Sequence, residues 1–334
     1  AVLCILLWKG LGKSWKPLAI MFSICGLVGA LPVFNVNQLT QAINTILLIP
    51  NGVDIGFTSN LTIGLILVSI TAVVILGGIV RISTIATKIV PTMVLLYFGA
   101  VMMILLVHIE VVPKYLALIF SDAFAADNFR GDSFLGGLVG GLILLGVKRG
   151  AFSNEAGIGT ASLAHGAAKT NEPVREGLVA MLVPVIDTLV VCTLTALAIL
   201  VTGVWESSSD NGVNLTAAAF ANAMPGYGKY LLLVCIAVFS VYSLFSFSYY
   251  GTKCLSFLIG ADKKHYYNYF YIASIILGAT ASLNMMINLI DSAFALMAIP
   301  TMLSTLILAP KVINELKAYK KRLKDGEFNA QRRL

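Results

Sequence analysis

Charged residues are the scarcest class in this sequence. Only 12% of the 334 residues are Asp, Glu, Lys or Arg, whereas about a quarter of a typical soluble domain is charged. Hydrophobic residues make up 58% of the chain, and the mean hydropathy is +0.89. A soluble protein of this composition would expose a large apolar surface to water. The composition therefore indicates an integral membrane protein.

Histidine and cysteine are also sparse, and their placement argues against several kinds of site. The 3 His residues lie near the ends of apolar runs, and the 5 Cys residues lie in or beside such runs without metal-binding or disulfide spacing. No nucleophile has a base at a recognisable spacing. We therefore expect no enzymatic activity, no cofactor and no resident metal centre. The net charge of +7 lies mostly in short loops and the C-terminal tail, which indicates membrane orientation and no nucleic-acid partner.

Long apolar runs are what the sequence has in abundance. About 20 apolar residues suffice to cross a hydrocarbon core roughly 30 Å thick. Residues 1–8 are apolar but too short to cross, so we expect the chain to begin inside a helix, with an upstream part missing. Residues 1–310 are interpreted as one helical membrane domain, with 109–132 as a candidate amphipathic surface helix. Full spans are predicted at residues 17–48, 61–80, 89–108, 133–165, 173–203, 226–258, 267–285 and 286–308.

The distribution of positive charge predicts the orientation of these spans. If the loop after residue 8 is cytoplasmic and the spans alternate, cytoplasmic stretches hold 18 Lys and Arg residues and the opposite stretches hold 3. This asymmetry satisfies the positive-inside rule. The basic tail, residues 311–334, is therefore predicted to be cytoplasmic.

The run 133–165 is interrupted by residues that are costly at membrane depth. A charge there costs a few kcal/mol, and each glycine lowers helix propensity by about 1 kcal/mol relative to alanine. One interpretation is a broken helix whose freed backbone groups line a cavity. The other is a polar loop between two shorter helices, in which Glu155 pairs with Arg149. The interrupting residues are Lys148, Arg149, Gly150, Ser153, Asn154, Glu155, Gly157 and Gly159.

Two other spans carry a polar face. Asn35, Gln38 and Gln41 recur at helical spacing in the first full span, as expected for interhelical hydrogen bonds or for contact with a substrate. Ser240, Ser243 and Ser246 recur in the same way in the span 226–258. Hydroxyl and free carbonyl oxygens suit a hard cation such as Na⁺, although a membrane serine often bonds a carbonyl of its own helix.

Two carboxylates lie in the remaining polar positions. Asp187 is in the middle of the span 173–203, where it is either a proton relay or a structural partner of backbone groups. Asp291 opens the last span, where it is either a buried functional acid or a solvated residue at the membrane interface.

The run KRGAFSNEAGIGTASLAHGAAKTNEPVREG, which starts at Lys148, resembles the alanine or glycine:cation symporter family, whose signature contains RG-x-x-SNEAG-x-G. Further matches are IDTLVVCT at 186–193, GGIVRIS at 77–83, YYG at 249–251 and DSAFALMAIP at 291–300, so the resemblance covers essentially the whole chain. It implies a leucine-transporter-like fold of two inverted repeats. In that fold this chain lacks helix one and most of helix two, and its broken span is helix six.

The resemblance also implies roles for individual residues. Gly150, Ser153, Asn154 and Gly157 match the unwound stretch beside the substrate, and Gln38 matches a candidate contact for the amino acid. Ser243 stands where the family usually has Thr, which implies a Na⁺ ligand, with Ser240 one turn before it. Phe247 stands where the family usually has Trp, as a wall of the substrate pocket. Arg149, Glu155 and Asp187 are left as possible charge-relay or structural residues.

The resulting expectation is a secondary-active symporter in the cell membrane, carrying alanine or glycine with Na⁺ by alternating access. The alternatives are a proton-coupled amino-acid transporter, with Glu155 or Asp187 as the carrier, and a non-functional fragment of such a transporter. Because helix one should supply half of the site, we expect the 334-residue chain alone not to transport.

Overall fold

The structure, a computed structural model, describes residues 8, 10–75, 78–123, 138–207 and 212–327. Every regular element in these ranges is helical, as predicted. Short π-helical segments, Asn44–Leu48 and Val185–Cys192, continue α3 and join α12 to α13. The α-helices are α2 (Lys16–Gly29), α3 (Val33–Ile43), α4 (Phe57–Ile75), α5 (Gly78–Val107), α6 (Val112–Ala123), α9 (Leu138–Ser153), α10 (Thr160–His165), α11 (Pro173–Ala180), α12 (Leu182–Pro184), α13 (Thr193–Val201), α14 (Val204–Ser207), α15 (Val213–Ala223), α16 (Gly228–Ile259), α17 (His265–Thr280) and α18 (Leu283–Lys324).

Six described segments are long and apolar enough to cross a membrane, so a polytopic helical membrane protein is supported. The other two predicted spans, 133–165 and 267–285, contain shorter helices, since α9 and α17 have 16 residues each. The boundary predicted at 285/286 was wrong: the chain turns at Ala281 and Ser282, whose extended backbone ends α17 and precedes α18. The six segments are Lys13–Asn51, Phe57–Ile75, Ile89–Val107, Pro173–Val201, Gly228–Ile259 and Leu283–Lys324.

Helix α18 passes the predicted end of the membrane domain without a break. It has 42 residues and continues through Pro300 and Pro310 to Lys324. At 1.5 Å per residue such a helix is about 63 Å long, roughly twice the hydrocarbon thickness. The basic tail therefore begins as a continuation of the last membrane helix.

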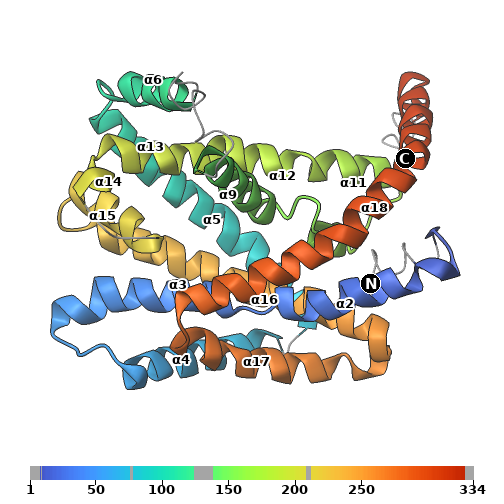
Figure 1. The fold of residues 1–334 in the computed structure, drawn as a ribbon, viewed down its shortest axis with the longest axis horizontal. Helices are drawn as coiled ribbons and strands as arrows, with labels where there is room; N and C mark the ends of the chain where they lie inside the picture. The colour runs from blue at the N-terminus through green and yellow to red at the C-terminus, as the bar shows by residue number, and fades with distance from the viewer. Residues whose placement is uncertain (1–7, 9, 76–77, 124–137, 208–211, 328–334) are drawn as a thin grey trace.

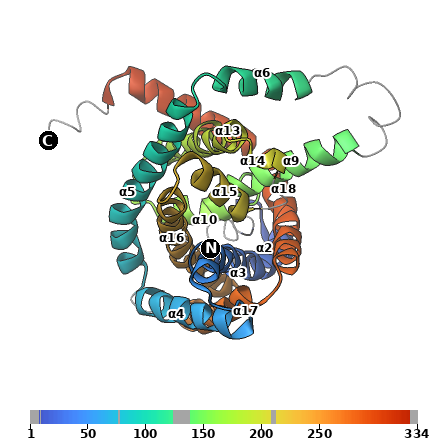
Figure 2. The same ribbon diagram turned by 90° about the vertical axis from the view of Figure 1, so that its left-hand side faces the viewer.

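The helices run back and forth along the long axis of the molecule (Figure 1). The N-terminal end, the start of α11 and the C-terminal end of α18 lie at one end, and the connection from α3 to α4 lies at the other (Figure 1). The charge count assumed that successive spans alternate in direction, and the path of the ribbon agrees with that assumption. The side of the membrane that each end faces stays a prediction. Of the predicted surface helix 109–132, Val112–Ala123 forms α6 at the periphery, and residues 124–132 lie outside the described part (Figure 2).

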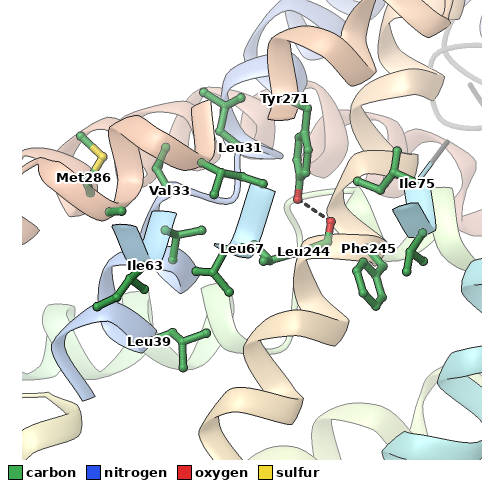
Figure 3. Packing of buried hydrophobic residues seen from close by; sticks show 14 of the residues in the cluster. Leu31, Val33, Leu39, Ile63, Leu67, Ile75, Leu244, Phe245, Tyr271 and Met286 are labelled. Carbon is green, nitrogen blue, oxygen red and sulfur yellow. Dashed lines mark hydrogen bonds between the residues drawn. The ribbon is translucent and has the colours of Figure 1, made fainter. Parts of the chain in front are cut away.

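Helix α16 is the central element, because it contributes to three buried apolar clusters. Leu244 and Phe245 pack with α3, α4 and α17 in the first cluster (Figure 3). Leu232 and Leu233 belong to the second, with α5, α13 and α15, and Cys254 belongs to the third, with α2, α10 and α18. One helix thus joins the packing of both ends of the molecule.

Polar side chains tie the apolar helices together at specific points. Tyr271 of α17 donates to the Leu244 carbonyl at 2.7 Å (Figure 3), and Tyr267 donates to the Leu27 carbonyl at 2.9 Å. The Asn37 amide of α3 donates to the carbonyls of Gly278 and Ala281, at the end of α17, at 3.2 and 2.8 Å. These bonds fix α17 against α3 and α16 while leaving few unpaired polar groups in an apolar surrounding.

Helices α17 and α3 approach each other closely at Gly278, so a substitution there tests this packing. A Cβ at Gly278 would lie 2.8 Å from the Val33 Cα and 2.9 Å from its carbonyl oxygen, and backbone atoms cannot turn away. We expect Gly278→Ala to lower the free energy of unfolding by about 1–3 kcal/mol through overpacking. The measurement is thermal unfolding of the detergent-solubilised protein.

Gly99→Ala is the matched control, because nothing lies within 4 Å of a Cβ built at Gly99, inside α5. It should leave the protein unchanged or stabilise it by up to about 1 kcal/mol through helix propensity. Equal unfolding temperatures for the two variants would contradict this account of the α3–α17 contact.

Candidate functional site

The helix predicted to be broken is interrupted between Ser153, the last residue of α9, and Thr160, the first of α10. The link contains three residues in the left-handed region, Glu155 (φ 54°), Gly157 (φ 75°) and Gly159 (φ 94°). Glu155 is the one non-glycine residue with positive φ in the described part of the chain. Non-glycine residues seldom adopt this conformation, and they persist in it where the surrounding structure imposes it, often at functional sites.

Side-chain donors form hydrogen bonds with backbone carbonyls on both sides of the break. The Gly150 carbonyl accepts from the Asn154 backbone N–H at 3.1 Å and from its side-chain amide at 2.8 Å. On the other side, the Thr301 hydroxyl of α18 lies 3.0 Å from the Ile158 carbonyl and 2.9 Å from the Met297 carbonyl of its own helix, so the two acceptors share its hydrogen. Ser162 donates to the Gly159 carbonyl at 2.6 Å. A helix can be interrupted at membrane depth only when such partners exist.

One flank of the break faces the π-helical segment Val185–Cys192. Ser153 donates to a carboxylate oxygen of Asp187 at 2.7 Å, and the Asn154 amide donates to the Thr188 hydroxyl at 2.6 Å. The side-chain oxygen of Asn154 is buried and has no hydrogen-bond partner among the described residues. A buried unpaired acceptor costs about 1–3 kcal/mol. This oxygen can therefore receive a donor such as an ammonium group.

The other flank faces α18 and carries charge. Asp291 accepts from Lys148 Nζ at 2.8 Å on one carboxylate oxygen, and Arg149 lies 3.3 Å from the other. Of the two interpretations of Asp291, solvation at the interface was wrong, because its side chain is only 9% exposed. The alternative pairing of Glu155 with Arg149 was also wrong: Arg149 pairs with Asp291, and no ion pair of Glu155 occurs among the described residues.

The two serines predicted to bind a cation are buried in α16, at 3% and 7% exposure. No hydrogen bond of the Ser240 or Ser243 hydroxyl occurs within the described part of the chain. By contrast, Ser246 donates to the Tyr242 carbonyl at 3.3 Å and Ser248 to the Phe245 carbonyl at 2.7 Å. The bonding of a serine to its own helix, which is the alternative to cation binding, therefore occurs at Ser246 and Ser248 and not at Ser240 or Ser243 in the described part of the chain.

Two further predicted residues lie on other helices. Gln38 of α3 presents its side-chain oxygen to Gly212, and its amide nitrogen is buried without a partner among the described residues. Phe247 of α16 packs against the first apolar cluster, with its ring centroid 5.8 Å from that of Tyr250. No hydrogen bond in the described ranges joins Gln38, Ser240 or Ser243 to the break.

The structure thus brings part of the predicted site together. Ser153 bonds Asp187, Asn154 bonds the Gly150 carbonyl and Thr188, and Arg149 flanks these residues. The roles of these residues in binding stay predictions. Sequence reasoning left out Asp291 and Thr301 from the site. The sequence contained a signal for Asp291, because two adjacent cations within an apolar run need a carboxylate partner. It contained no signal for Thr301.

The comparisons with known proteins agree on a family. The description "Sodium:alanine symporter family" belongs to the profile that matches residues 4–333. The chain is 37% identical over 324 residues to the sodium/alanine symporter AgcS of Methanococcus maripaludis, with 96% of this chain and 68% of AgcS covered. An uncharacterized transporter of Haemophilus influenzae is 34% identical (96% and 69% covered), and a probable sodium/glutamine symporter, GlnT, of Bacillus subtilis is 32% identical (96% and 64% covered). The chain therefore spans about two thirds of the length of these relatives.

The contact between Thr301 and the break can be tested by stability. Thr301→Val keeps the shape of the side chain but removes the hydroxyl that reaches the Ile158 carbonyl. We expect a loss of about 1–3 kcal/mol in the free energy of unfolding, because a buried carbonyl is left without this partner. Thermal unfolding in detergent measures it.

Thr305→Val is the control one turn further along α18, where the hydroxyl bonds only the Thr301 carbonyl of its own helix. It should change stability by less than about 1 kcal/mol. If Thr305→Val lowers the free energy of unfolding as much as Thr301→Val does, the contact between Thr301 and the break contributes no more than a hydrogen bond within one helix.

Proposed function

Because this chain belongs to the sodium:alanine symporter family, we propose that it carries a small neutral amino acid, alanine or glycine, across the cell membrane together with Na⁺. The observation that supports this most is the helix break between Ser153 and Thr160, with the buried, unpaired oxygen of Asn154 beside it. Discontinuous membrane helices supply the binding groups of many secondary transporters.

In the proposed mechanism the amino acid binds beside residues 150–159. Its ammonium group donates to Asn154 Oδ1, which satisfies an acceptor that is otherwise buried unpaired. Gln38 contributes its free amide nitrogen, and Phe247 walls the apolar side of the pocket. An α-amino acid with a small side chain needs few apolar contacts, which fits alanine or glycine better than a larger substrate.

Na⁺ binds at Ser240 and Ser243 in this proposal, since hydroxyl oxygens with free lone pairs are ligands for a hard cation. Sodium and substrate together favour one access state, so the ion gradient drives uptake by alternating access. The inverted-repeat fold, with the basic tail in the cytoplasm, belongs to the same proposal.

A proton-coupled transporter is the second candidate. Glu155 favours it, because this residue lies in the break, has a left-handed backbone and has no ion-pair partner among the described residues. Membrane carboxylates of this kind often carry protons. Asp187 would be the neighbouring acceptor through Ser153.

The direct test is uptake of labelled alanine by proteoliposomes that contain the protein expressed from its complete coding sequence. An inward Na⁺ gradient should drive accumulation, and a proton gradient without Na⁺ should not. Accumulation under a proton gradient alone would replace Na⁺ coupling by the Glu155 alternative. No alanine or glycine uptake under either gradient would contradict the proposed substrate.

A serine pair tests the proposed ion site. Ser243→Ala removes an unpaired hydroxyl from the proposed Na⁺ site, and we expect the Na⁺ concentration for half-maximal uptake to rise about tenfold, which corresponds to about 1.4 kcal/mol of binding. Ser246→Ala, in the same helix, removes a hydroxyl that already bonds the Tyr242 carbonyl and should leave Na⁺ dependence unchanged. The proposed site is wrong if both variants have the same Na⁺ dependence as the parent protein.

A further inference from the structure

The chain from Lys148 to Ile158 follows one face of α18. Lys148 and Arg149 contact Asp291, and the Phe152 ring lies 5.3 Å from the Phe294 ring in an edge-to-face arrangement. Further along, a Cβ built at Gly157 would lie 3.0 Å from the Met302 sulfur, and the Thr301 hydroxyl lies 3.0 Å from the Ile158 carbonyl. The contacts advance in the same direction on both segments, so the end of α9 and the break lie parallel to α18. Asp291 makes the first contacts of this series.

Residues 144–147, the part of α9 before its last turns, contribute little apolar packing that would fix its direction. Leu144, Leu145 and Val147 are exposed, with Leu144 at 68%. Figure 2 shows α9 leaving the bundle at an angle. Its described side-chain contacts gather in the last turns, toward Asp291 on one side and toward Asp187 and Thr188 on the other. Directional polar contacts on both flanks, together with the packing of Phe152 on Phe294, therefore hold the end of α9.

Positive charges outnumber negative charges at the contact between α9 and α18. Two adjacent cations share one carboxylate, and both oxygens of that carboxylate are engaged. Asp187, the acidic residue on the other flank, is engaged by Ser153. Removing one cation would leave a balanced pair, whereas removing the Asp291 charge would leave two adjacent like charges, on side chains 38% and 46% exposed, without the carboxylate that both contact.

We propose that Asp291 is a positioning residue for the broken helix, whose carboxylate holds Lys148 and Arg149 and thereby sets where Gly150, Ser153 and Asn154 present their polar groups. Arg149 directly precedes Gly150, and Asn154 follows little more than one helical turn later. A small shift of this turn displaces the Asn154 oxygen, and misplacing a binding group by about 1 Å costs much of its effect. The inference rests on the proposed transport for its kinetic test but not for its structural test.

The structural test measures distance between α9 and α18 by spin labels at two exposed positions, Leu144→Cys and Leu306→Cys, in a background without the native cysteines. We expect Asp291→Asn to broaden the distance distribution, and Asp291→Glu to restore a narrow one. Ser292→Ala is the control, because Ser292 is exposed and bonds only the Asn288 carbonyl of its own helix. An unchanged, narrow distribution in Asp291→Asn would overturn the proposal.

The kinetic test uses alanine uptake by the same variants. Asp291→Asn should raise KM about tenfold or more while the variant still inserts and unfolds cooperatively, and Lys148→Gln or Arg149→Gln alone should raise it less, since each leaves one balanced pair. Equal effects of all three single substitutions would overturn the charge argument. If the parent protein takes up no amino acid, the proposed function fails, and the label distances still decide the role of Asp291.

Discussion

A backbone hydrogen-bonding group inside a bilayer must find its partner within the protein, and the arrangement of this molecule follows from that constraint. Most of the described chain meets it by being helical. Between Ser153 and Thr160 the helix stops, and partners come from elsewhere: the Asn154 amide, Ser162 and, from α18, Thr301. The Asn154 oxygen is buried and unpaired, as are several side-chain atoms elsewhere in the described part of the chain, among them Asn44 Oδ1 and Gln38 Nε2. Its position at the break makes it the acceptor that we assign to the substrate.

Two long helices position this break. α16 joins the three apolar clusters and therefore fixes the frame of the bundle. α18 supplies Asp291, Phe294 and Thr301 along one face to the segment 148–158. On the opposite flank, the π-helical segment Val185–Cys192 contributes Asp187 and Thr188. π-Helical turns are rare and occur frequently at functional sites. The break is thus held from two directions by elements that are remote in sequence.

Sequence reasoning reached the all-helical membrane fold, because composition and the length of apolar runs determine it. It also located the interruption, since charges and glycines in the middle of an apolar run end a helix, whether as a broken span or as a loop between two shorter helices. It did not reach the partner of Arg149, because pairing across 142 residues depends on how two helices pack. The environment of Asp291 stayed open for the same reason: its position near the start of an apolar run allows solvation, whereas packing against α9 buries it. The turn at Ala281 was placed too late, since hydropathy does not distinguish one apolar helix end from the next.

The central claim is that the broken helix forms the amino-acid site. Its most direct test is an experimental structure of the protein from its complete coding sequence, determined with alanine and Na⁺ bound. The account predicts ligand density beside residues 150–159, with the ammonium group at Asn154 Oδ1 and a cation at Ser240 and Ser243. Alanine bound elsewhere, with the Asn154 oxygen still unpaired or bonded within the protein, would contradict it.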